Sequence, residues 1–168
     1  MELNSKILQS RKEEKMEKIK VLIADDNLRS AGLMEEAIKK DKEIEVIGKA
    51  EDGMDALDQI RTKEPDVVLL DLIMPKLDGL GVMEHVKKDI TLKKVPSFIV
   101  ITGIGQEVVT ESAFELGASY YMQKPVQFDM LAKRLKDLLK DFTLSDMGDK
   151  VISLKKPQPK KAGHNKEA

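Results

Sequence analysis

The strongest constraint on the fold is a regular alternation of two hydrophobic patterns. Five short runs, rich in β-branched residues, read as strands buried on both faces. Each is followed by a longer segment with apolar residues at helical spacing. The predicted strands are 19–24, 43–50, 66–70, 97–101 and 119–122, and the predicted helices are 28–40, 54–63, 80–88, 106–116 and 127–140.

This alternation favours an α/β fold with a parallel sheet covered by helices on both faces. Crossovers between parallel strands are right-handed, and strands spaced in this way suit the doubly wound order 2-1-3-4-5. Asn27 is the expected N-cap of the first helix, and Gly117 is expected to end the fourth. Helical spacing places Leu28, Met54 and Phe128 among the inward-facing side chains.

The pattern divides the chain of 168 residues into one domain with two appended segments. We predict a charged N-terminal extension over 1–16, the domain over 17–141 and a linker or tail over 142–168. The tail is rich in Lys and Pro with little to bury, which is typical of a linker. A basic arm that touches nucleic acid is the alternative.

The amino-acid composition of the chain argues against several classes of function. The chain has 29 basic and 30 acidic residues, so its net charge of -1 gives no argument for binding nucleic acid or an anionic membrane. It has no cysteine, which excludes disulfides and thiolate metal sites. There is no apolar run of membrane-spanning length and no signal-peptide pattern. We therefore expect a cytoplasmic protein without membrane contact.

Polar residues follow four of the five predicted strands. Asp25 and Asp26 follow the first, Asp71 the third, Thr102 with Gly103 the fourth, and Lys124 the fifth. In an open parallel sheet, ligands bind outside the carboxyl ends of the strands. We expect these groups to converge there, although Asp25 and Asp26 taken alone also fit a turn.

Three converging carboxylates need a cation, and oxygen ligands without His or Cys suit Mg²⁺. A carboxylate can also act as a nucleophile toward phosphorus. Asp71 is the best candidate because it ends the middle strand. Lys124 would add positive charge, while the Thr102 hydroxyl and the Gly103 amide could donate to phosphoryl oxygens, with no side chain at Gly103 in the way.

Four strings, ADDN, LLDLIMPKLDG, VITG and YYMQKP, resemble the response-regulator receiver family, and the resemblance covers about residues 19–140. It implies a flavodoxin-like fold and a signalling role. Asp25 and Asp26 would be the acidic pair at the metal, with Asp71 the phosphoacceptor. The carbonyl of Ile73 would be the backbone metal ligand.

The same resemblance makes Thr102 the switch hydroxyl and Lys124 the lysine that pairs with phosphate, followed by a cis bond to Pro125. Tyr121 matches the switch aromatic residue. Gly103 replaces the family's usual alanine, and Ile73 is apolar where many relatives carry a polar side chain. The identity of Ile73 bears on how fast the aspartyl phosphate hydrolyses.

Longer strings narrow the resemblance. MEKIKVLIADDN, EVIGKAEDG, LDLIMPKLDGLGVME and GQEVVTESAFELGASYYMQKP are similar to the receivers of the stage-zero sporulation master regulators of spore-forming Firmicutes. Such regulators continue through a linker into a helical DNA-binding domain, so the tail here resembles the start of that linker. Met1 and Met16 both fit as the native start.

The leading hypothesis is a phosphorylation switch and not an enzyme, with at most slow autodephosphorylation. A histidine kinase or histidine phosphotransferase would donate the phosphoryl group. The face of the fourth helix, fifth strand and last helix would then change partner, often to form a homodimer, and DNA would be reached only through a C-terminal domain. Two alternatives remain: a stand-alone phosphorelay receiver, and an aspartate-nucleophile phosphohydrolase, which needs a second Asp where this chain has Ile73.

Overall fold

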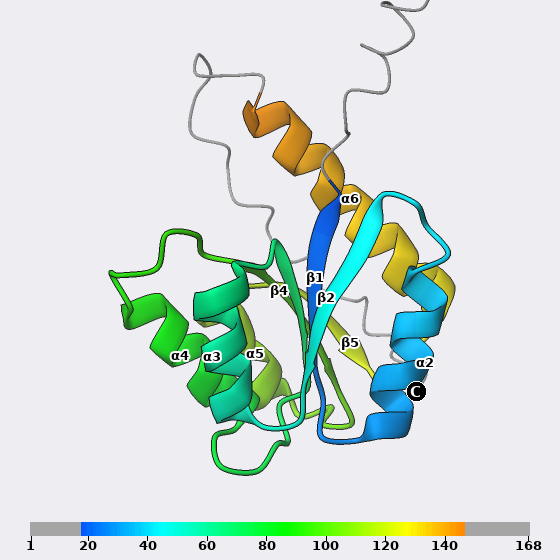
Figure 1. Cartoon of the computed structure of the whole chain (residues 1–168). Coiled ribbons are helices and arrows are strands. Elements are labelled where there is room, and N and C mark those ends of the chain that lie inside the picture. The colour runs from blue at the N-terminus through cyan, green and yellow to red at the C-terminus, as the bar shows by residue number, and fades with distance from the viewer. Residues whose placement is uncertain (1–17, 147–168) are drawn as a thin grey trace, which may run out of the picture.

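The computed structural model describes residues 18–146, so the predicted extension 1–16 and most of the predicted tail 142–168 lie outside the described residues. Strands and helices alternate throughout this range (Figure 1). The strands are β1 (Ile19–Ala24), β2 (Ile44–Ala50), β3 (Val67–Leu70), β4 (Ser97–Thr102) and β5 (Ala118–Gln123). The helices are α2 (Leu28–Ile38), α3 (Gly53–Lys63), α4 (Gly79–Lys88), α5 (Glu107–Glu115) and α6 (Phe128–Asp146).

The predicted topology is confirmed. Every pairing between neighbouring strands is parallel, and the order is β2-β1-β3-β4-β5. Helices α3, α4 and α5 cover one face of the sheet, and α2 and α6 cover the other (Figure 1). All five strands therefore end at the same edge, which is where the candidate site is built.

Side chains of the central strands alternate between two hydrophobic clusters, one on each face. Leu22 and Val68 pack under α3 and α4, whereas Val21 and Ile23 pack under α2 and α6. Strand β3 is buried along its whole length. Within residues 18–146, no helix has the length and apolar character to cross a membrane.

The ends of two helices differ from the prediction by two residues or more. Helix α2 ends at Ile38, because the polar residues that follow turn away from the core and Asp41 N–H donates to the Ile38 carbonyl at 3.1 Å. Helix α6 runs on to Asp146 instead of ending near 140. Leu139 and Phe142 continue its apolar spacing and pack against the same cluster as α2.

The predicted orientation of three side chains is wrong. Leu28 is 63% exposed, Met54 51% and Phe128 37%. Each lies in the first turn of its helix, beside the carboxyl edge of the sheet, where the strands have ended and no other part of residues 18–146 buries these side chains. The residues one or two turns later, such as Ala31, Leu57 and Leu131, are buried as expected.

The two predicted helix caps, Asn27 and Gly117, are confirmed. The Asn27 side chain accepts a hydrogen bond from the Ser30 amide at 3.0 Å. Gly117 follows α5 with a φ of 102°, in the left-handed region that glycine enters without strain, and its amide donates to the Phe114 carbonyl at 3.0 Å.

Two glycines should respond to alanine in opposite directions. Gly117→Ala places a Cβ on a left-handed backbone and should lower the free energy of unfolding by about 1 kcal/mol or more. Gly32→Ala, inside α2 with open space around it, should raise it by about 0.5–1 kcal/mol. Urea denaturation followed by circular dichroism measures both. Equal effects in the two variants would contradict this account of the α5 end.

Candidate functional site

Two acidic residues are fixed by the backbone just beyond adjacent strands. Asp25 follows β1, and its amide donates to the Ala50 carbonyl at 3.0 Å. Asp71 follows β3, and its amide donates to the Ala24 carbonyl at 2.9 Å. These bonds extend the sheet ladder by one residue in each case. Both carboxylates are consequently held on a rigid frame, with Asp25 1% and Asp71 6% exposed.

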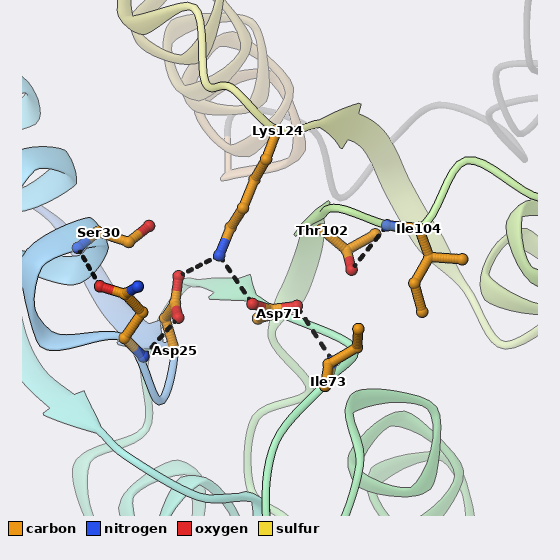
Figure 2. Close-up of polar contacts among 8 residues, drawn as sticks. Asp25, Ser30, Asp71, Ile73, Thr102, Ile104 and Lys124 are labelled. Atoms are coloured by element: carbon orange, nitrogen blue, oxygen red, sulfur yellow. Dashed lines mark hydrogen bonds and ion pairs between the residues drawn. The ribbon is translucent and has the colours of Figure 1, made fainter.

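The side chain of Lys124 points toward these two carboxylates, and its ammonium group contacts both (Figure 2). Its Nζ lies 2.8 Å from Oδ2 of Asp25 and 2.8 Å from Oδ2 of Asp71. The Lys124 amide donates to the Thr102 carbonyl at 2.8 Å, which ties the end of β5 to the end of β4. The peptide bond from Lys124 to Pro125 is cis, as the family resemblance implies.

The charge balance of this triad favours a protonated Lys124. Partial burial by itself would lower the pKa of its ammonium, but the hydrogen bonds to Asp25 and Asp71 outweigh that effect and hold the pKa above its ordinary value. Lys124 thus remains a cation through the neutral range, and its charge offsets the repulsion between the two buried carboxylates.

Asp26 adds a third carboxylate on the solvent side. Oxygen atoms of Asp25, Asp26 and Asp71 all lie within 4.8 Å of one another, and Asp26 is exposed whereas its two neighbours are buried. The donor set is made of oxygen alone and carries three negative charges, which fits a hard divalent cation. Because Asp26 is exposed, an ion can reach the three carboxylates from solution.

The remaining carboxylate oxygens accept local backbone bonds. Oδ1 of Asp25 accepts from the Asn27 amide at 2.9 Å, and Oδ1 of Asp71 accepts from the Ile73 amide at 3.1 Å (Figure 2). The Ile73 side chain is 59% exposed beside the site. The metal-ligand role of the Ile73 carbonyl stays a prediction.

Thr102 and Tyr121 both contact the loop that follows β4. The Thr102 side chain is fully buried, and its Oγ1 accepts from the Ile104 amide at 3.4 Å (Figure 2). The Tyr121 hydroxyl donates to the Ile104 carbonyl. One residue of this loop therefore contacts both predicted switch residues.

Gly103 lies exposed beside Thr102, and a Cβ built there would meet nothing within 4 Å. A methyl group at position 103 would therefore not block the approach of a phosphoryl group from this side. That agrees with the alanine which the resemblance assigns to this position in relatives.

Sequence reasoning missed the structural importance of Gly79. The Gly79 amide donates to the Leu72 carbonyl at 2.9 Å, and a Cβ there would lie 2.4 Å from the Asp71 carbonyl oxygen and 2.7 Å from Leu72 Cα. The start of α4 thus rests directly on the backbone of Asp71. In the sequence, the Asp-Gly pair at 78–79 marks only the start of α4, which Asp78 caps.

Residues 21–136, more than half of the chain, match the family model described as the response regulator receiver domain. The chain belongs to the response regulator receiver family. Receivers are signalling domains of two-component systems, and the fold and acidic edge described above agree with that membership.

Solved receiver structures share this fold. The receiver domain of AraT from Geobacillus stearothermophilus is 30% identical with a TM-score of 0.67, over 76% of this chain and 97% of that one. The Francisella response regulator 1452 receiver is 28% identical with a TM-score of 0.64, over 74% and 99%. The receiver of NarL from Mycobacterium tuberculosis is 27% identical with a TM-score of 0.68, over 74% and 98%.

Two glycines near Asp71 should differ in their tolerance of alanine. Gly79→Ala forces a methyl group against the Asp71 backbone and should cost about 1–3 kcal/mol of stability, since that backbone cannot move freely. Gly103→Ala has open space and should change stability by less than about 0.5 kcal/mol. Thermal denaturation of both variants tests this. A tolerated Gly79→Ala would show that α4 does not set the position of Asp71.

Proposed function

We propose that this receiver accepts a phosphoryl group on Asp71 from a phosphohistidine donor. The supporting observation is that the Lys124 ammonium lies 2.8 Å from both Asp71 and Asp25 at the carboxyl edge of the sheet. From this position the Lys124 ammonium can pair with a phosphoryl group added to Asp71. A triad of one lysine and two carboxylates therefore suits a site that gains and loses a phosphoryl group.

In the transfer, a carboxylate oxygen of Asp71 attacks phosphorus. A P–O bond forms as the P–N bond to the donor imidazole breaks, and the nitrogen keeps the electron pair. Lys124 then pairs with a phosphoryl oxygen, and the Thr102 hydroxyl and the Gly103 amide donate to the others. Asp25 stays in place through its bond from the Asn27 amide.

Asp25, Asp26 and Asp71, with the carbonyl of Ile73, would hold Mg²⁺, which neutralises phosphoryl oxygens and orients them. The fit rests on the all-oxygen donor set within 4.8 Å. Asp26 is the exposed carboxylate of the three, so the ion would enter the site past Asp26.

The switch would run from Thr102 through the loop after β4 to β5. We expect the Thr102 side chain to move toward the phosphoryl oxygen to which it donates, and this movement would break the long 3.4 Å contact with the Ile104 amide. Ile104 also accepts from Tyr121, so the loop and the aromatic ring change together. The face of α5, β5 and α6 would then select a new partner, including a second copy of the receiver.

The longer sequence resemblance supports a narrower role for a cytoplasmic regulator of sporulation transcription. Its donor would be a histidine kinase or a histidine phosphotransferase. DNA binding would belong to a domain following the linker, whereas a stand-alone phosphorelay receiver would have none. Reading the gene beyond the codon for Ala168 separates these two roles.

Acetyl phosphate with Mg²⁺ should add a single phosphoryl group to this chain. Asp71→Asn removes the nucleophile and should abolish the addition. Asp66→Asn is the matched control, because Asp66 stands at the opposite end of β3 and bonds the Lys20 amide and Lys94. Intact-protein mass spectrometry gives the readout. Undiminished labelling of Asp71→Asn would refute the proposed acceptor.

The lifetime of the phosphoryl group should depend on Ile73. Its exposed alkyl side chain beside Asp71 offers no hydrogen bond to an attacking water. Ile73→Asn supplies an amide that can orient water, so hydrolysis should become several times faster, whereas Ile73→Val should leave it unchanged. The decay of phosphorylated protein after removal of acetyl phosphate measures both rates. Equal rates in the two variants would remove Ile73 from the control of lifetime.

A further inference from the structure

Within residues 18–146, strand β2 forms one edge of the sheet and pairs only with β1 (Figure 1). The Ala50 carbonyl faces β1, since it accepts from the Asp25 amide. Successive carbonyls of a strand point to opposite sides, so the Lys49 carbonyl points away from the sheet. An outward row of unpaired backbone groups is a template for adding a further strand.

Side chains of α3 close this edge. Gln59 Nε2 donates to the Lys49 carbonyl at 2.9 Å, and Lys63 Nζ donates to the Ile47 carbonyl at 3.2 Å. Lys63 Nζ also donates to Gln59 Oε1 at 3.0 Å, and Gln59 Nε2 donates to Asp55 Oδ2 at 3.1 Å. Asp55, Gln59 and Lys63 are spaced by four residues, so they form one row on the helix beside the strand.

Gly48 makes room for this row. A Cβ at Gly48 would lie 2.2 Å from Gln59 Oε1 and 2.8 Å from Lys63 Nζ. The register of β2 against β1 shifts between the pairs that contain Val46 and Gly48, which leaves Ile47 as an extra residue in the edge strand. The bulge and the glycine together bring two edge carbonyls within reach of α3.

We propose that Gln59 and Lys63 form a clasp that keeps β2 from pairing with β2 of a second copy of this chain. The strand is suited to self-pairing, because Ile44, Val46 and Ile47 give it high β-propensity and identical edges can meet about a twofold axis. A closed β2 edge directs assembly of the domain to other surfaces.

The test compares two double variants of the full chain. Gln59→Ala with Lys63→Ala removes the clasp. Asp58→Ala with Thr62→Ala removes neighbouring exposed side chains with the same spacing on the same helix, without touching β2. Sedimentation velocity over a concentration series should show a species of at least twice the monomer mass only for the first variant. Identical sedimentation of the two double variants would overturn the proposal.

Two further variants make the outcome specific to the strand edge. Gly48→Ala displaces the flexible ends of Gln59 and Lys63 without changing α3, so it should also promote self-association. Lys49→Pro removes an outward amide, and added to the Gln59→Ala, Lys63→Ala variant it should restore the monomer. Association that persists with Lys49→Pro, or a Gly48→Ala variant that stays monomeric, would contradict the clasp.

Discussion

The contact of one ammonium group with two buried carboxylates is the interaction on which the rest of this domain depends. Asp25 and Asp71 are nearly inaccessible to solvent and end adjacent strands, so they would repel each other strongly without a cation between them. Lys124 supplies that cation at 2.8 Å from each. It does so from β5, two strands away from β3, and the parallel order of the sheet brings all three ends to one edge.

This arrangement also connects the acidic edge to a distant surface. The Lys124 amide bonds the Thr102 carbonyl, and Thr102 and Tyr121 both contact Ile104 in the loop before α5. We propose that a change of charge at Asp71 is transmitted along these contacts to the face of α5, β5 and α6. Strand β2, the lateral edge strand on the opposite side of the sheet from β5, is covered by side chains of α3.

Much of the fold follows from local patterns, because buried parallel strands and amphipathic helices have distinct periods. The convergence of Asp25, Asp71 and Lys124 follows from strand order alone. Hydrophobic spacing could not show where the sheet ends, which is why Leu28, Met54 and Phe128 were expected inward and are exposed. The role of Gly79 depends on the approach of α4 to the Asp71 backbone, a tertiary contact that no local pattern encodes.

The most direct test of the central claim is to locate the phosphoryl group chemically. Borohydride reduces an aspartyl phosphate to homoserine, which marks the acceptor permanently. After phosphorylation by a phosphohistidine donor, reduction and peptide mass spectrometry, we expect homoserine at position 71 and unchanged aspartate at 25 and 26. Homoserine at another position, or a stable phosphoryl group on a different type of side chain, would contradict the proposed acceptor.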